Sequence, residues 1–222
     1  MLKRVTIADV KADPEISLYL RRSTEYLKLL GFTDHGHRHA NLVSVLAKKI
    51  LIKLDYPARI CELAAIAGYL HDIGNLINRH NHGGSGAVLA YSILNRMGMQ
   101  PEEIAIIISA IGNHEEEIGH AINPAAAALI LADKSDVHRS RVTNKDIAKF
   151  EIHDRVNYAA ESSSVLVDAP NRRITLKVTI DTNICPVMEY FEIFLLRMIM
   201  CRRAAEFLEC RFGLLINENE LL

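Results

Sequence analysis

The stretch ICELAAIAGYLHDIGN, residues 60–75, carries the pattern on which the interpretation of this sequence depends. Its apolar residues recur at helical spacing and share one face of a predicted helix: Ile60, Leu63, Ala64, Ala67 and Leu70. His71 continues that face, and Asp72 follows at the helix end, just before Gly74. The segment therefore predicts a buried helix that ends in an imidazole and a carboxylate, two side-chain types that bind metals.

Four more predicted helices carry a metal-binding side-chain type on their apolar face. They are His39 with Leu42, Val43, Leu46 and Ile50; His82 with Gly86, Ala90, Ile93 and Leu94; His114 with Ile104, Ile107 and Ile111; and Asp133 with Ala126, Leu129 and Ile130, in a helix that Pro124 opens. A single such residue is most simply a hydrogen-bonded core or surface side chain. Five such clusters would each need a separate buried partner, because unpartnered buried polar groups are costly. One or two shared cations satisfy them together, which favours a centre for metal-assisted hydrolysis.

The remaining histidines do not follow this pattern. His37, His80, His138 and His153 are expected to be exposed or to support the site from outside. His120 follows Gly119 in a loop between the fourth and fifth of these helices, where a pocket wall can form. We do not expect His120 to bind metal.

Composition limits the class of protein. The chain has 222 residues, half of them hydrophobic, so it can bury a full core in one large domain or in a main domain with an appendage. The net charge of -1 and a pI near 6.8 argue against binding to bulk nucleic acid or to a membrane surface. The four cysteines form no CxxC motif and are expected to be buried free thiols. Because charges occupy the first residues and no apolar run reaches membrane-spanning length, we expect a soluble, cytoplasmic protein.

The periodicity changes near residue 150. Residues 164–168 and 173–181 alternate apolar and polar side chains around a turn at 169–172, which predicts a β-hairpin. A long amphipathic helix at 186–209 and a short strand at 211–217 follow. These elements form a small α+β unit with the order β-β-α-β.

The predicted fold class is mainly α, with a helical metal-binding domain over residues 1–150 and the α+β appendage over residues 151–222. No cluster of ligand-type side chains follows Asp133, so the appendage is expected to supply no metal ligand. Its run at 193–200 is more apolar than one core face needs. Either this helix packs onto the helical domain, or it also covers a partner such as a second copy in a homodimer. In both cases Leu196 is expected to be buried.

The ordered set of metal-competent residues resembles the HD superfamily of metal-dependent phosphohydrolases. The resemblance covers roughly residues 30–142 and rests on DHGHRHANLV at 34–43, YLHDIGN at 69–75, NHEE at 113–116 and LILADKSD at 129–136, with His82 between them. It implies an HD-type helical bundle. It also implies that one metal is held by His39, His71, Asp72 and Asp133, and that Asp72 bridges to a second metal held by His82 and His114.

Two branches of this family fit less well. The HD-GYP branch carries paired histidines where this chain has Asn113 and His114, and no GYP motif follows, so cyclic-di-GMP hydrolysis is disfavoured. The guanosine tetraphosphate hydrolases carry an acidic pair that this chain lacks. The resemblance thus implies hydrolysis of a phosphate ester or anhydride, with a nucleotide or another small phosphorylated metabolite as substrate.

The implied reaction is attack by a hydroxide that bridges two divalent transition metals, with Asp72 as the bridging carboxylate. Imidazole-rich ligation favours Fe, Mn, Co, Ni or Zn over Mg but does not choose among them. Lys134, Arg139 and Arg141 are candidate phosphate contacts, although a solvated helix face explains each of them equally well.

His35 is the candidate acid that protonates the leaving group. It precedes His39 by four residues, one helical turn, and therefore approaches the site without filling a ligand position. A surface position near the helix start is an equal alternative. A second function also stays open: a non-catalytic regulatory HD protein, in which the metal centre is structural or senses a ligand. The enzyme is favoured because no position of the ligand set is lost.

Overall fold

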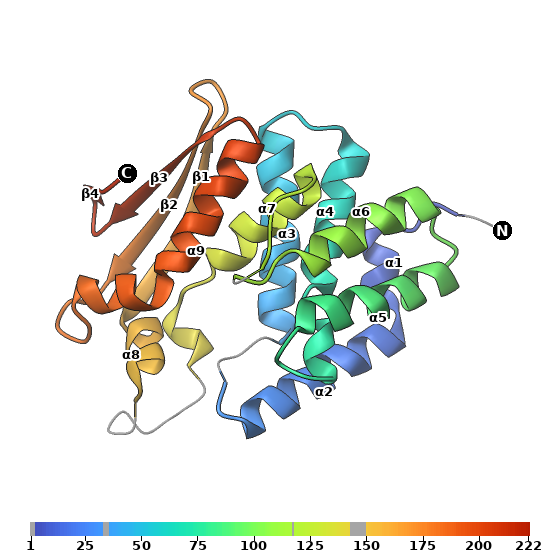
Figure 1. Ribbon diagram of the computed structural model, residues 1–222, viewed down its shortest axis with the longest axis horizontal. Coiled ribbons are helices and arrows are strands. Elements are labelled where there is room, and N and C mark those ends of the chain that lie inside the picture. Colours follow the sequence, from blue (N-terminus) through green and yellow to red (C-terminus); the bar gives the residue numbers. More distant parts are fainter. Residues whose placement is uncertain (1–2, 33–35, 117, 143–149) are drawn as a thin grey trace.

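The computed structural model of the protein describes residues 3–32, 36–116, 118–142 and 150–222. Its elements are, in chain order, α1 (Ile7–Ala12), α2 (Pro14–Leu29), α3 (His37–Lys53), α4 (Ala58–Leu70), η1 (Ile73–Leu76), α5 (His82–Arg96), α6 (Pro101–Gly112), α7 (Pro124–Lys134), η2 (Arg139–Arg141), α8 (Ile152–Ala159), β1 (Ala160–Asp168), β2 (Arg173–Ile180), α9 (Val187–Phe207), β3 (Arg211–Ile216) and β4 (Asn219–Glu220). Figure 1 shows the helical part on one side of the molecule and the sheet on the other.

Two helices begin where the sequence predicts. Asp13 caps α2, whose first residue is Pro14. Asn123 caps α7 by accepting a hydrogen bond from the backbone N–H of Ala126, and Pro124 is again the first helical residue. Both prolines occupy a position whose N–H has no partner within the helix, so they cost the helix nothing there.

Helix α7 is the most deeply buried helix of the part of the chain described. It packs against α3, α4, α6 and α9, and all residues from Ala125 to Lys134 are buried. Its first turns consist of alanines, whose small side chains allow neighbouring helices to approach closely. A helix that is apolar on all sides must be surrounded in this way. Asp133 and Lys134 are thereby carried into the interior at its last turn.

The order of the helices brings five helix ends together. α3 packs along α4 and α5 packs along α6, so the start of one helix lies beside the end of the next. α7 packs against α6 and ends in the same region. The inward-facing residues at the ends of these helices therefore meet.

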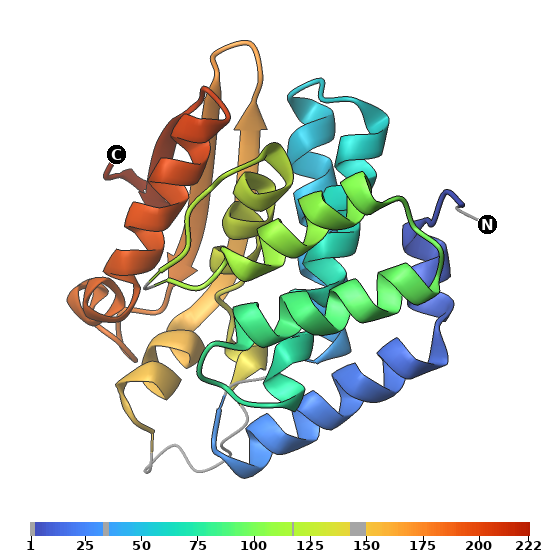
Figure 2. The same cartoon turned by 45° about the vertical axis from the view of Figure 1, so that its right-hand side comes forward.

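The sheet has the strand order β1-β2-β3-β4. β1 and β2 form the predicted antiparallel hairpin, and β2 pairs in parallel with β3. α9 makes the crossover that a parallel pair requires. It packs against β2 and β3 and also against α7, as Figure 2 shows. Helix α9 therefore joins the sheet to the helical part.

The predicted fold class is confirmed: the protein is mainly α, with a C-terminal β-β-α-β unit to which the structure adds the short strand β4. Two predicted burials are wrong. Leu42 is 39% exposed because its part of α3 faces a surface pocket. Leu196 is 57% exposed, because it lies on a side of α9 that its packing against the sheet, α7 and α8 leaves open. The domain boundary at residue 150 stays a prediction.

The cysteines behave as the sequence predicts, since all four are buried and free. Burial raises the pKa of the Cys201 thiol to about 12, so this thiol is protonated at neutral pH. Among the described residues, no helix combines the length and the apolar character that a membrane crossing requires.

Candidate metal centre

Six side chains from the ends of five helices meet in the interior of the helical part. They are His39, His71, Asp72, His82, His114 and Asp133. All six are buried, and the most exposed of them, Asp133, retains only 8% of its accessible surface. The structure thus brings together all the residues for which the sequence predicts metal binding. Among the described residues, no group of this kind includes a side chain that follows Asp133.

The first group consists of His39, His71, Asp133 and one oxygen of Asp72. His39 Nε2 lies 3.2 Å from His71 Nε2 and 3.2 Å from Asp133 Oδ1. His71 Nε2 lies 3.5 Å from the same Asp133 oxygen. Asp72 Oδ2 completes the group, at 3.6 Å from His39 Nε2 and 3.4 Å from His71 Nε2.

The second group consists of His82, His114 and the other oxygen of Asp72. The two Nε2 atoms lie 3.1 Å apart. Asp72 Oδ1 lies 3.3 Å from His82 Nε2 and 4.0 Å from His114 Nε2. The two oxygens of Asp72 therefore face different groups, which is the arrangement that a bridging carboxylate needs.

These separations fit ligands of a common ion. Nitrogen and oxygen ligands at about 2.1 Å from a transition metal lie about 3.0 Å apart when they are adjacent in an octahedron, and about 3.4 Å apart in a tetrahedron. The separations within the first group run from 3.2 to 3.6 Å. In the second group, only the 4.0 Å between Asp72 and His114 lies well outside this range. The residues present thus fit metal ligation.

Each of the four imidazoles presents Nε2 to the centre because its Nδ1 is held by an oxygen outside it. An acceptor at Nδ1 fixes the ring proton there and leaves the Nε2 lone pair for a metal. The Nδ1 contacts are His71 to the Gly68 carbonyl oxygen at 2.9 Å, His82 to that of Arg79 at 3.0 Å, His114 to that of Ile111 at 2.6 Å, and His39 to Asp136 Oδ2 at 2.7 Å.

The centre consequently gathers acceptor atoms, and the pKa values of its members shift in different directions. Burial lowers the pKa of His71, but the carboxylates of Asp72 and Asp133 raise it by more, so the net shift is upward. Burial raises the pKa of Asp133, but Lys134 and the neighbouring imidazoles together lower it well below its usual value. Burial, assisted by His71 and Lys134, holds the pKa of His114 well below its usual value. At neutral pH Asp133 is therefore ionised and His114 is neutral, the forms that bind metals.

A steric constraint explains why position 74, in the HDIG motif, is a glycine. A Cβ at this position would overlap the carbonyl oxygen of His82 and lie 2.5 Å from the backbone nitrogen of Gly86. The start of α5 therefore rests directly on η1. This contact places His82 beside Asp72, and only glycine permits it.

One carboxylate that the sequence interpretation missed supports the first group. Asp136 is buried, and its Oδ2 contacts both His39 Nδ1 and Arg38 Nη2, at 2.7 and 2.8 Å. The signal was present in LILADKSD, where Asp136 follows Asp133 by three residues. The sequence does not show which of the two aspartates reaches the centre and which reaches the far side of an imidazole.

Two further carboxylates missed from the sequence belong to NHEE. Glu115 Oε1 accepts a hydrogen bond from the Gly83 N–H at 2.6 Å, and its Oε2 lies 3.4 Å from His82 Nδ1. Glu116 Oε1 lies 2.7 Å from Arg197 Nε of α9 and 3.6 Å from Lys134 Nζ. The appendage thus reaches the edge of the centre through an ion pair.

The three predicted phosphate contacts have different surroundings. Lys134 is buried, and its Nζ lies 2.7 Å from Asp133 Oδ2, beside the centre. Arg141 is also buried and donates to the backbone carbonyl of Asp136 at 2.6 Å. Arg139 instead pairs with Glu161 of β1 and lies over the ring of Tyr158. Arg139, which lies on the short helix η2, therefore contacts the appendage.

The other histidines lie outside the six. His37, His80, His120 and His153 are exposed, and His138 is half-buried with its Nδ1 accepting from the backbone N–H of Ser140. His35, the predicted leaving-group acid, lies outside the residues that the structure describes.

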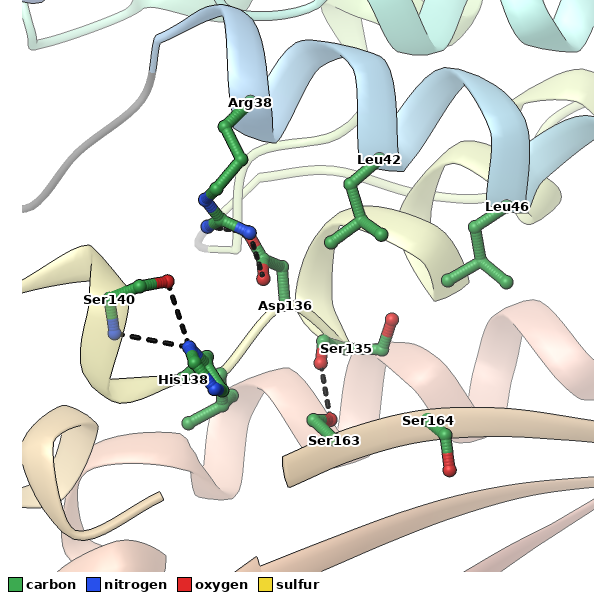
Figure 3. A pocket seen from close by; sticks show the side chains of 10 residues that line it. Arg38, Leu42, Leu46, Ser135, Asp136, His138, Ser140, Ser163 and Ser164 are labelled. Carbon is green, nitrogen blue, oxygen red and sulfur yellow. Dashed lines mark hydrogen bonds and ion pairs between the residues drawn. The ribbon is translucent and has the colours of Figure 1, made fainter. Parts of the chain in front are cut away.

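A pocket of about 360 Å³ borders Asp136. Figure 3 shows Arg38 reaching to Asp136 at one end, with Leu42 and Leu46 of α3 along one wall and Ser163 and Ser164 of β1 along another. The six metal-competent side chains do not line it. The pocket therefore borders Asp136, which contacts His39 from outside the centre, and does not reach the six side chains themselves.

Comparisons with known proteins found similarity to a curated protein and to solved structures. No family model matches the chain. An uncharacterized protein of Methanocaldococcus jannaschii is 31% identical over 134 residues, which make up 50% of this chain and 51% of that protein. The chain therefore spans about half the length of this curated relative.

A crystal structure of a predicted HD superfamily hydrolase from an uncultured Thermotogales bacterium is similar at 25% identity and a TM-score of 0.44. The similarity covers 56% of this chain and 67% of that chain.

Proposed function

We propose that this protein is an HD-type hydrolase that uses two divalent transition metals to cleave a phosphate ester or anhydride of a nucleotide or another small phosphorylated metabolite. The observation that carries the proposal is the position of Asp72, whose Oδ1 lies 3.3 Å from His82 Nε2 while its Oδ2 lies 3.4 Å from His71 Nε2. A carboxylate shared by two imidazole groups is typical of two-metal hydrolytic sites. Such a metal pair activates a water molecule and takes up charge on phosphoryl oxygens.

The side chains of this protein supply the orientation that this chemistry needs. The four imidazoles are fixed by their Nδ1 contacts, and Asp133 is held by Lys134, so the ligand atoms are in place before any ion binds. Burial of the centre keeps bulk water away from the ligands. Preorganisation of this kind is expensive to maintain in a protein interior and is explained by function rather than by stability.

Cations around the centre suit an anionic substrate. Lys134 Nζ lies 2.7 Å from Asp133 Oδ2. Burial lowers the pKa of Arg141, and the charges of Asp136, Asp133 and Asp72 oppose that shift. Positive charge from α7, η2 and α9 therefore surrounds one edge of the centre. We propose Lys134 and Arg141 as the residues that favour phosphate there, through their charge.

The test is hydrolysis by protein whose metal content is known. Metal is removed by chelation, the loss of ions is measured, and Mn, Fe, Co, Ni or Zn is added back one at a time. Activity is then measured on a chromogenic phosphomonoester, a chromogenic phosphodiester and a panel of nucleotides and phosphorylated metabolites. An Asp72→Ala protein prepared in the same way controls for contaminating phosphatases.

The expected result is turnover that appears only with an added transition metal and only with Asp72 present. Stoichiometric metal binding without turnover of any of these substrates would favour the regulatory alternative. Absence of metal binding by the wild-type protein would refute both.

A further inference from the structure

We infer that Asp136 is a positioning residue that acts through His39 and makes the first group, His39, His71 and Asp133 with Asp72 Oδ2, the tighter of the two metal sites. The inference rests on the proposed metal centre and goes beyond it. It ranks the two sites by their affinity for metal, which the ligand types alone do not do. Three observations carry it: the partner at Nδ1, the charges that surround Asp136, and the weaker support of the second group.

The partner at Nδ1 differs among the four imidazoles. His71, His82 and His114 each direct Nδ1 to a backbone carbonyl, whereas His39 directs it to a carboxylate, at 2.7 Å. A carboxylate bears a full charge and accepts more strongly than a carbonyl dipole. It therefore raises the basicity of the imidazole and strengthens the bond that Nε2 makes to a metal.

Two guanidinium groups lie beside the buried carboxylate of Asp136. Arg38 Nη2 lies 2.8 Å from Oδ2, and Arg141 Nε lies 3.8 Å from the same oxygen. Two positive charges at these distances favour the charged form of the Asp136 carboxylate. An ionised carboxylate only accepts hydrogen bonds. The proton of His39 therefore stays on Nδ1, and Nε2 points its lone pair at the centre.

In the second group, the carboxylate nearest to an imidazole Nδ1 makes a longer contact. Glu115 Oε2 lies 3.4 Å from His82 Nδ1, but the carbonyl of Arg79 is closer, at 3.0 Å, and Glu115 also accepts the N–H of Gly83. Lys134 opposes the ranking, because its Nζ lies 2.7 Å from Asp133 Oδ2 in the first group. It contacts the oxygen of Asp133 that faces away from His39, so Oδ1 keeps its position 3.2 Å from His39 Nε2.

The direct test is Asp136→Asn. Oδ2 is shared by two donors, His39 and Arg38, so the amide oxygen is expected to take its place and keep both contacts. The charge and the longer contact of Arg38 Nη1 with Oδ1 are lost. In a cobalt titration followed by calorimetry and visible absorption, we expect the affinity for the first ion to fall by about 10- to 100-fold. The affinity for the second ion should change little. The absorption spectrum of the first equivalent should change, which a purely structural role would not cause.

The matched control is Arg38→Gln. It removes the other partner of Asp136 Oδ2 but leaves both His39 and Arg141 in place. If Asp136 acts through His39, Arg38→Gln keeps the affinity of the wild-type protein for the first ion. If Asp136 only anchors α3 through Arg38, the two variants lose affinity equally, and the inference is overturned.

A measurement on the unmodified protein covers the case in which Asp136→Asn does not fold. In nitrogen-15 NMR spectra of the metal-free protein, His39 should carry its proton on Nδ1, and this proton should resonate farther downfield than the Nδ1 protons of the other three imidazoles. A proton on Nε2 of His39 would overturn the inference. A wild-type protein that binds no cobalt would refute the proposed function itself, so the two failures are distinguishable.

Discussion

Asp72 Oδ1 lies 3.3 Å from His82 Nε2, and the other oxygen of Asp72 lies 3.4 Å from His71 Nε2. Asp72 is therefore the one side chain among the six that contacts both imidazole groups through different atoms. Substitutions at Asp72 and at His82 should have different consequences. The first removes a ligand from both proposed ions, and the second removes a ligand from only one.

Asp72→Ala should abolish activity and deplete both metals, whereas the fully loaded wild-type protein should contain two ions per chain, about 3.5 to 4 Å apart. Elemental analysis measures the content, and anomalous scattering from crystals gives the positions. A fully loaded wild-type protein with one ion, and with His82 and His114 directed elsewhere, would contradict the two-metal centre.

His82→Ala should yield a protein with one ion, because it removes a ligand of the second group and leaves the first intact. His39→Ala is the matched variant for the first group. Elemental analysis after exhaustive dialysis measures the metal content of both variants. The ion that remains in His82→Ala is held by four side-chain atoms and should survive dialysis, whereas His39→Ala removes one of those four atoms. Two tightly bound ions in His82→Ala would show that His82 is not a ligand.

His35→Ala should keep the metals and slow turnover by about 10²- to 10⁴-fold, the usual effect of losing a general acid. The loss should be largest for a substrate with a poor leaving group, because such a group needs protonation as it departs. A substrate with a good leaving group serves as the internal control. Undiminished turnover of the poor substrate would remove His35 from the mechanism.

Gly74→Ala should destabilise the protein, because its methyl group overlaps the His82 carbonyl oxygen. Overpacking of this kind costs about 1 to 3 kcal/mol, and the displacement of α5 should also weaken binding of the second ion. The matched control is Gly112→Ala at the end of α6, where a Cβ meets only Ala87 at 3.9 Å. We expect Gly112→Ala to be neutral or to raise the free energy of unfolding by up to about 1 kcal/mol. Urea denaturation of both variants gives the comparison, and equal stabilities would show that α5 can move away from Gly74.

Leu196→Glu should change the free energy of unfolding by less than about 0.5 kcal/mol, because Leu196 is largely exposed on α9. Phe194→Ala, two residues away, should cost about 3 to 5 kcal/mol, since Phe194 is fully buried and packs against Tyr190 with ring centroids 5.0 Å apart. Denaturant unfolding measures both. Strong destabilisation by Leu196→Glu would mean that this face is covered, and loss of a wild-type dimer, measured by sedimentation, would assign the cover to a second copy.

The sequence by itself determined that the five metal-binding positions on helix faces point inward. Apolar residues at helical spacing carry His39, His71, His82, His114 and Asp133 on the buried faces of their helices, because periodicity along a helix fixes which side a residue occupies. The alternation after residue 160 likewise predicted the hairpin of β1 and β2. Both predictions rest on local spacing, and both hold in the structure.

Only the tertiary structure decided which inward-facing groups are partners. Asp136 lies beside His39 across 97 residues, Arg139 turns to Glu161, and Leu196 is left uncovered because α9 packs on only part of its circumference. Periodicity fixes the direction of a side chain from its own helix. It does not fix what another helix places opposite, because that depends on how helices distant in sequence pack against one another.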